Sequence, residues 1–379
     1  MAAEPFEPGA VIAALANYPP LPLDVGVRAA IVGGFVRDVW LGREPRELDL
    51  VLEGDVAPLA QALGGDYVVH EPFGTATAMG DGWRIDLAMA RRERYPAPGA
   101  LPEVEPASIE EDLERRDFTV NAVAVTLDGG ELIAVEGALE DLAAGSLRGL
   151  HDASFSDDPT RLIRLARYAE RLGLRIDPHT AALARASGFA TLSGGRLGGE
   201  LRLAFTEPDP IAVLSHLAEQ LPISIDRAQI EAATGLAPAD SNRPMLLLGA
   251  VARDEEWLGG LELTAREHAI ALACHRARPP ADETPSALWR AWHEVPVEAV
   301  ALAGARGGAA AAARWIEELR HVKLEIGGDD LLAAGVPEGP RIGHALERTL
   351  AAKLDGELAA GRLAELAHAL AVAGAGSGR

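Results

Sequence analysis

Three acidic side chains in the first quarter of the chain have the types and spacing of a divalent-metal site. Glu47 and Asp49 stand two residues apart in the run RELDLV, and in a β-strand such side chains point to the same side. Asp86 lies in a second run of this kind, WRIDLAMA. Pairing of the two strands would bring Asp86 next to Asp49. Oxygen ligands suit Mg²⁺, and three carboxylates on neighbouring strands can hold two ions.

A pair of glycines lies just upstream of these acids. Gly33 and Gly34 end the run AAIVGG and open FVRDVWLG, which we expect to be a strand followed by a helix. Glycines let backbone N–H groups approach a phosphate closely, and a helix N-terminus favours anions. Arg37 lies one turn into this helix, within expected reach of a triphosphate. The stretch predicts a nucleotide site facing the acids; the alternative is a plain strand–turn–helix with exposed carboxylates.

The segment DDPTRLIRLARY repeats charged residues at a spacing of three, which places them on one face of a helix. These residues are Asp158, Arg161, Arg164 and Arg167. Asp157 or Asp158 suits the N-cap of that helix, and Pro159 suits its first turn. A carboxylate accepts a hydrogen bond from an exocyclic amine, and a guanidinium donates to a ring acceptor. An Asp-Arg pair therefore selects cytosine and adenine over uracil and guanine; the alternative is a surface ladder of ion pairs.

A second arginine cluster, EEDLERRDFTVNA, places Arg115 and Arg116 before Asp117 and Asn121. Arginine offers a planar fork of donors that suits triphosphate oxygens. Asp117 and Asn121 are four residues apart, so on a helix they share a face. The alternative is a capped, charged start of a helix.

The hydrophobic pattern changes character along the chain. Residues 28–150 read as mixed α/β, with short apolar runs separated by turns, whereas apolar residues recur at helical spacing from about residue 157. We expect an α+β protein in which a mixed sheet with helices precedes an all-helical body and tail. Its expected parts are an N-terminal extension (1–27), a head (28–150), a helical region (151–225) and a helical body and tail (226–379). Tyr95–Ser108 is expected to be a proline-rich, mobile loop.

Composition restricts the classes of function. The 379 residues carry a net charge of −22, and residues 1–150 hold 11 arginines and no lysine against 26 acidic residues, a net charge of −15. Phosphate binding draws on basic surface, so a nucleic-acid partner requires local arginine clusters. Cys274 is the only cysteine, which excludes disulfide scaffolds and favours a reducing cytoplasm. We find no apolar run long enough to span a membrane and no basic secretion signal.

Three long segments resemble the bacterial-type tRNA nucleotidyltransferases, the family of CCA-adding enzymes and poly(A) polymerases. They are residues 32–51, beginning VGGFVRDVW, residues 73–125, which contain WRIDLAMA and RRDFTVNA, and residues 150–177, which contain DDPTRLIRLARY. A weaker likeness covers residues 327–358. The resemblance therefore extends over most of the chain, from about residue 28 to 360, and implies a nucleotidyltransferase-type head followed by helices.

This resemblance implies Mg²⁺-dependent transfer of CMP or AMP from CTP or ATP to the 3′ end of tRNA. Glu47, Asp49 and Asp86 would be the catalytic, metal-binding acids. The implied nucleotide-binding residues are Gly33, Gly34, Arg37, Asp38, Arg116, Asp117, Asn121, Asp158, Arg161, Arg164 and Arg167. The implied partner is the tRNA acceptor end, bound by helices beyond residue 170, with no membrane involved. Full CCA addition, CC-only, A-only and poly(A) addition remain alternatives, and the Tyr95–Ser108 loop is one place where they would differ.

The chain departs from the family pattern at its first metal acid, which is usually Asp and here is Glu47. Glutamate is one methylene longer, and a displacement of about 1 Å can cost on the order of 10²-fold in rate. Ala134 stands where the family usually has an acid, and the head is itself acidic. These departures leave a second hypothesis, a catalytically weakened or inactive homologue that still binds RNA or nucleotides.

Overall fold

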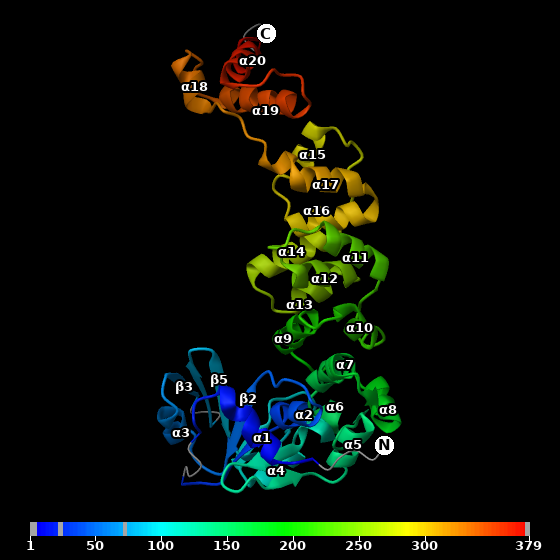
Figure 1. Cartoon of the computed structure of the whole chain (residues 1–379). Coiled ribbons are helices and arrows are strands. Elements are labelled where there is room, and N and C mark those ends of the chain that lie inside the picture. The colour runs from blue at the N-terminus through cyan, green and yellow to red at the C-terminus, as the bar shows by residue number, and fades with distance from the viewer. Residues whose placement is uncertain (1–5, 22–25, 71–73, 376–379) are drawn as a thin grey trace. The chain divides into compact units, whose positions relative to one another are not determined.

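The structure is a computed structural model that describes residues 6–21, 26–70 and 74–375. Within these residues the contacts divide the chain into two compact units, Met1–Leu221 and Pro222–Arg379 (Figure 1). We expected four parts; the head and the helical region that follows it lie in one unit. The finer boundaries after residues 27, 150 and 225 stay predictions.

A mixed sheet forms the centre of the first unit. Seven strands of the described chain build it, in the order β3-β4-β5-β2-β1-β8-β9. They are β1 (Ala29–Val32), β2 (Leu48–Leu52), β3 (Asp66–His70), β4 (Thr75–Gly80), β5 (Trp83–Met89), β8 (Val123–Thr126) and β9 (Leu132–Ala134). Leu48 and Leu50 are each 1% exposed while Asp49 between them is half-buried, which is the alternation that a strand requires.

Strand pairing places the acidic runs side by side. β2 and β5 are parallel neighbours, and their register sets Asp49 opposite Asp86. The strands β2, β1 and β8 pair antiparallel in turn, as do β3, β4 and β5. The predicted pairing of the two acidic strands is therefore confirmed.

Short helices and two small ribbons surround this sheet. Helix α2 packs against β1, β2 and β8. The helices up to residue 157 are α1 (Gly9–Ala13), α2 (Gly34–Trp40), α3 (Ala57–Ala62), α4 (Ile109–Glu114), α5 (Ala138–Ala144) and α6 (Ser154–Asp157), with the 3-10 turns η1 (Ala14–Asn17) and η3 (Thr119–Asn121). The ribbons pair β6 (Arg91–Arg94) with β7 (Glu103–Pro106), and β10 (Ser146–Leu147) with β11 (Arg175–Ile176).

Three local expectations are wrong. The segment expected to be a loop from Tyr95 contains β7, because its residues 103–106 find a partner in β6. Asp117 and Asn121 do not share an α-helix, because α4 ends at Glu114 and a short 3-10 turn follows. The two-residue strand β11 lies in the region expected to be wholly helical, where it adds to β10.

Helices complete the first unit and form the described part of the second. In the first unit they are α7 (Thr160–Leu172), α8 (Pro178–Ala186), α9 (Gly194–Phe205) and α10 (Pro210–Ser215). In the second they are α11 (Arg227–Leu236), α12 (Arg243–Val251), α13 (Glu255–Gly260), α14 (Ala265–Arg276), α15 (Pro285–Trp292), α16 (Val297–Ala303), η4 (Gly304–Gly308), α17 (Ala309–Glu317), η5 (Leu319–His321), α18 (Gly328–Ala333), α19 (Pro340–Leu354) and α20 (Arg362–Ala375).

These elements confirm the predicted class, a mixed sheet with helices followed by a helical body. No helix in the described part of the chain has the length and apolarity needed to cross a membrane.

Candidate active site

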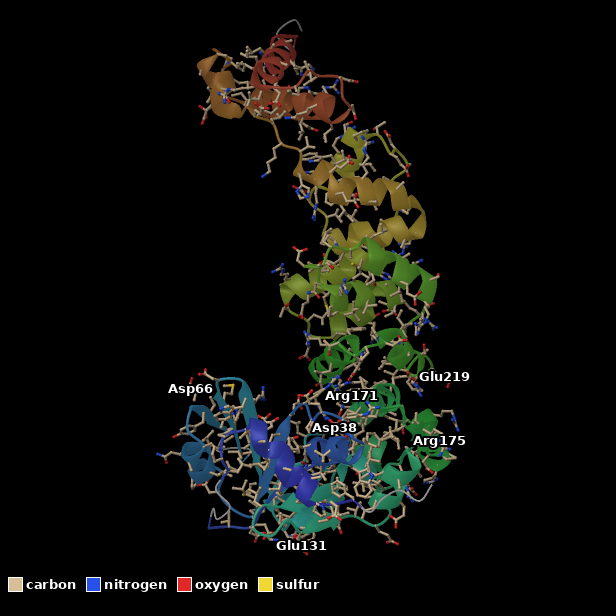
Figure 2. The ribbon with its side chains drawn as sticks, in the orientation of Figure 1. Asp38, Asp66, Glu131, Arg171, Arg175 and Glu219 are labelled. Carbon is tan, nitrogen blue, oxygen red and sulfur yellow. The ribbon has the colours of Figure 1, made fainter. Side chains whose placement is uncertain are left out.

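A large polar cavity lies in the first unit, between the sheet and helices α7 and α9. Its volume is about 1070 Å³. Among the described residues, eleven arginines and eight carboxylate side chains line it, so its walls are basic although the chain is acidic. Asp38 and Arg171, both labelled in Figure 2, belong to this lining. Such a cavity suits a multiply charged anion.

Asp49 is the most buried of the three predicted metal acids. Its pKa rises from 3.8 to about 6, mainly because burial disfavours the carboxylate, with repulsion from Asp86 and Glu47 adding to the effect. Arg116 opposes this shift only in part. A nearby cation would stabilise the ionised form of this carboxyl.

Asp86 lies beside Asp49 in the register, but its oxygens are already engaged. Thr77 Oγ1 donates to Asp86 Oδ1 over 2.6 Å, and Arg84 Nε donates to Oδ2 over 3.0 Å. Glu47 precedes β2 and is exposed. In the described chain no three acidic, His or Cys side chains are close enough to hold a metal. The carboxylate oxygens of these three residues are the kind of ligand that a divalent cation prefers.

Gly33 makes room for the guanidinium of Arg116 at the cavity wall. Gly33 has φ +67°, and a Cβ at this position would lie 2.8 Å from Arg116 Nη1. Arg116 Nη2 donates to the buried Asp112 over 3.0 Å, whereas Arg116 Nε is buried without a hydrogen-bond partner. Buried donors without a partner are rare in folded proteins. Gly34 lines the same cavity.

Arg37 and its neighbours form a buried network. Arg37 donates to Asp38 Oδ1 over 2.6 and 2.8 Å and to Asn121 Oδ1 over 2.5 Å. Asn121 Nδ2 donates to Asp117 Oδ1 over 2.9 Å, and Arg164 Nε donates to Asp117 Oδ2 over 2.7 Å. Arg37 lines the cavity while its donors bind Asp38 and Asn121, and its predicted contact with a triphosphate stays a prediction.

Asp117 and Arg164 keep each other ionised within this network. Burial alone would raise the pKa of Asp117, but Arg164 and the hydrogen bonds from Asn121 and Arg164 hold that pKa below its usual value. Asp117 in turn raises the pKa of Arg164. Asp117 and Arg164 are therefore held as an ion pair at the cavity. Arg164 is the most exposed residue of this network.

Asp158 and Arg161 both line the cavity, but they do not pair with each other. Asp158 Oδ1 accepts from Thr160 N over 3.0 Å and from Arg196 Nη2 over 2.7 Å, but the N-cap residue of α7 is Pro159, not Asp157 or Asp158 as expected. Arg161 Nη1 donates to Ser154 Oγ over 2.8 Å, and Nη2 donates to the Arg115 carbonyl over 2.7 Å. Both side chains are thus held by other protein groups while they line the cavity, and their predicted role in reading a base stays a prediction.

Helix α9 supplies site residues that the sequence reasoning missed. Arg196 holds Asp158, and Arg167 Nη1 donates to Glu200 Oε2 over 3.1 Å while Arg167 Nε donates to Glu207 Oε1 over 3.0 Å. Arg196 and Glu200 stand four apart in GGRLGGELRLAF, and this spacing is the signal that could have found them. Arg167 is therefore bound to α9, and it lines the same cavity as Asp158, Arg161 and Arg164, as expected for residues on one face of α7.

Tyr168 is a further missed residue. Its ring lies within 5.0–5.5 Å of the guanidinium carbons of Arg37, Arg164 and Arg171, all of which line the cavity. An aromatic face attracts such cations, so Tyr168 gathers positive charge on one wall of the cavity.

Comparison with known proteins identifies what this arrangement resembles. Residues 29–148 match the poly(A) polymerase head-domain family. An A-adding tRNA nucleotidyltransferase of Geobacter sulfurreducens is 33% identical over 380 residues, which cover 86% of this chain and 43% of that protein. A CC-adding tRNA nucleotidyltransferase of Deinococcus radiodurans is 44% identical over 189 residues, covering 48% of this chain and 50% of that protein. The chain thus spans about half the length of these curated relatives, or less.

Solved structures match over nearly the whole chain. A CCA-adding enzyme aligns with a TM-score of 0.76 and 27% identity, covering 97% of this chain and 96% of that one. The CCA-adding enzyme of Thermotoga maritima in complex with tRNA aligns with a TM-score of 0.71 and 26% identity, with the same coverage.

Proposed function

We propose that the chain is a member of the tRNA nucleotidyltransferase and poly(A) polymerase family, and that it adds nucleotides to the 3′ end of tRNA. The proposed reaction transfers CMP or AMP from CTP or ATP without a template. The observation that carries the proposal is the pairing of Asp49 with Asp86 at the border of a basic cavity that also contains Asp158 and Arg161.

Glu47, Asp49 and Asp86 are the proposed metal-binding acids, and Mg²⁺ is the proposed ion because it prefers carboxylate and phosphate oxygens. When bound, it would neutralise the triphosphate and activate the attacking hydroxyl. Asp49 is the proposed central ligand of the three, because burial disfavours its ionised form and a neighbouring cation would stabilise it.

The cavity residues would bind and orient the incoming nucleotide. Gly33 and Gly34 leave room at the wall, and the guanidinium of Arg116 at that wall would meet the triphosphate. Asp158 and Arg161 would read the base edge once the nucleotide enters. The 3′ oxygen of tRNA would attack the α-phosphorus, the bond to pyrophosphate would break, and the hydroxyl proton would leave to solvent.

The remaining predicted residues support this cavity. We propose that Arg37, Asp38, Asp117 and Asn121 hold Arg164 in position, and that Arg167 fixes α7 against α9. The helical second unit is the proposed binding surface for the acceptor arm, which proteins recognise by A-form shape and phosphates. A cytoplasmic location, expected from the single cysteine, stays a prediction.

Incorporation of labelled nucleotides tests this function. We would incubate the purified protein with Mg²⁺, labelled CTP or ATP, and tRNA transcripts that lack one, two or all three terminal nucleotides. We expect growth of at least one transcript, and the product lengths separate CCA, CC-only, A-only and poly(A) addition. Absence of growth on every transcript contradicts the proposal.

The inactive-homologue hypothesis finds no support in the relatives, which are nucleotidyltransferases by name. The Glu47→Asp variant, assayed beside the native protein, separates the two hypotheses directly. Growth only after Glu47→Asp would favour the weakened homologue, whereas growth by the native protein removes that hypothesis.

A further inference from the structure

An arginine outside the large cavity joins the ends of two helices that line it. Arg43 lies in the exposed turn between α2 and β2, four residues before Glu47. Its Nη1 donates to the Arg171 carbonyl over 2.9 Å, and its Nη2 donates to the Leu172 carbonyl over 3.0 Å. These two residues end α7, and the last carbonyls of a helix have no partner within it. Arg43 therefore satisfies two groups that α7 leaves open.

The backbone of Arg43 is itself fixed to the end of α2. Gly42, with φ +65°, reverses the chain there, and its N–H donates to the Val39 carbonyl over 3.0 Å. The N–H of Arg43 donates to the Asp38 carbonyl over 2.8 Å. These are the two bonds of a Schellman motif, a common way for a helix to end at a glycine. The guanidinium of Arg43 thus extends from a fixed point on α2 to the end of α7.

The two joined helices carry side chains that face each other in the large cavity. Arg37 and Asp38 of α2 line this cavity, as do Tyr168 and Arg171 in the last turns of α7. The Tyr168 ring centre lies 5.3 Å from the guanidinium carbon of Arg37 and 5.0 Å from that of Arg171. Asp38 and Arg171, whose carbonyls accept from Arg43, are both labelled in Figure 2. These cation–π contacts depend on the spacing of α2 and α7, which Arg43 holds.

The chemistry of this link favours arginine. The C-terminus of a helix carries partial negative charge, so a cation is stabilised there. The planar guanidinium offers two donors at a fixed separation, and Arg43 uses one for each carbonyl. Removing the side chain would leave both carbonyls to water and free the last turn of α7.

We propose that Arg43 is a positioning residue for nucleotide binding, which holds Tyr168 and Arg171 in place by fixing the end of α7 against α2. This inference rests on the proposed nucleotidyl transfer and adds a residue that acts from outside the cavity. Asp158 and Arg161, the proposed base-reading residues, lie at the opposite end of α7. Arg43 should therefore affect the binding of CTP and ATP equally.

The test compares Arg43→Ala and Arg43→Lys with the native protein. Hydrogen–deuterium exchange over residues 165–173 measures the order of the last turns of α7, and calorimetric titration with Mg²⁺ present gives the Kd for CTP and ATP without RNA. We expect exchange in Arg43→Ala to become about 3- to 10-fold faster, and both Kd values to rise by about the same factor. Arg43→Lys keeps a cation that donates to carbonyls, so its values should lie between those of Arg43→Ala and the native protein.

Nucleotide incorporation gives a second readout. The KM for CTP and ATP should rise with the Kd in Arg43→Ala, while kcat stays close to native, because the acids on β2 and β5 are unchanged. Selection of CTP and ATP over UTP should also stay native. A role in stability alone would lower the free energy of unfolding and leave KM and Kd unchanged.

Arg175→Ala is the matched control. Arg175 Nη2 also donates to the last carbonyl of a helix, that of Ala144 in α5, over 3.3 Å, and Arg175 does not line the large cavity. This control should keep native Kd values and native exchange in α7. Urea unfolding of each variant shows that the protein under test is folded.

Native Kd values for both nucleotides in Arg43→Ala would overturn the inference even with faster exchange in α7, because Arg43 would then be only a helix cap. Native exchange in α7, or a rise in Kd for one nucleotide alone, would overturn it as well. The exchange and Kd measurements do not depend on catalysis. A native protein that binds CTP and ATP but extends no RNA therefore contradicts the proposed function, while these measurements still decide the role of Arg43.

Discussion

At the residue scale, burial and two neighbouring carboxyls act together on Asp49. Its ionised form is disfavoured inside the protein, and Asp86 and Glu47 add repulsion that a cation would relieve. The same features that make Asp49 costly to ionise make it a good anchor for a metal. The free energy of unfolding should therefore depend on pH and on the presence of a divalent cation.

Replacing Asp49 by Asn tests this link. Below pH 3.8 the native carboxyl is neutral in the folded and unfolded states, so both proteins should be about equally stable. As the pH rises through about 6, the folded native protein must ionise a buried group that ionises more easily when unfolded. Without divalent cations, Asp49→Asn should exceed the native free energy of unfolding by up to about 3 kcal/mol at pH 8.

Urea unfolding followed by circular dichroism at pH 4 and pH 8 measures this difference. Added Mg²⁺ should reduce the advantage of the variant at pH 8, because the ion stabilises only the native carboxylate. A difference of the same size at both pH values would contradict the account of Asp49.

Base selection is the second prediction at this scale. In Asp158→Asn, an amide oxygen can still accept from Thr160 and Arg196, but the amide nitrogen now offers a donor to a base carbonyl. Incorporation of UMP relative to CMP should rise about 10- to 100-fold, the range of a charged hydrogen bond of about 1.5–3 kcal/mol. Competition between labelled UTP and CTP measures it.

Asp152→Ala is the control for this prediction, because Asp152 is an exposed acid near α7 that pairs with His179 on the surface. The control should keep native selectivity. Unchanged selectivity in Asp158→Asn would remove Asp158 from base recognition.

At the scale of elements, the start of α7 is joined to the head by the ion pair of Asp117 and Arg164. Asp117 is 6% exposed and accepts from Arg164, Asn121 and the Phe118 backbone. Asp117→Ala leaves these donors without their acceptor and should lower the free energy of unfolding by about 2 kcal/mol, less than for a fully buried pair because water reaches the Arg164 side chain, which is 36% exposed.

The exposed pair of Arg94 and Glu103 gives the comparison. Its side chains are 80% and 60% exposed, so Glu103→Ala should leave the free energy of unfolding nearly unchanged. Both variants are measured by urea unfolding at pH 7. Equal effects of the two substitutions would show that the buried network does not stabilise the first unit.

The elements themselves were largely predictable, because local patterns determine them. Alternating apolar residues marked β2 and β5, and the shared pattern predicted the pairing that sets Asp49 beside Asp86. The partners of Asp158 and Arg161 were not predictable, because Arg196 and Ser154 come from separate segments that only the fold brings near. Sequence spacing predicts which residues share an element, and tertiary packing decides which of them bond.

At the scale of the whole molecule, an acidic chain concentrates arginine where an anion would bind. The net charge is −22, yet arginines outnumber carboxylates among the described residues of the large cavity. Under the proposed function, the net negative charge opposes the approach of RNA, so we expect the chain to contact only a few phosphates.

This distribution predicts a weak salt dependence of tRNA binding. Each neutralised phosphate contributes about −0.7 to −0.9 to the slope of log K against log salt. A chain with few such contacts should give a slope between 0 and about −4, measured by anisotropy from low to moderate NaCl. A slope of about −8 or steeper would indicate a basic RNA-binding face that the account does not contain.

Nucleotide incorporation by Asp49→Asn is the measurement that tests the central claim most directly. With Mg²⁺, CTP, ATP and a transcript lacking its terminal CCA, we expect the native protein to extend the RNA. The variant should lose at least about 10³-fold in rate, about 4 kcal/mol of transition-state stabilisation, while its Kd for ATP changes little. An Asp49→Asn protein that extends the RNA at the native rate would contradict metal-assisted transfer at these acids.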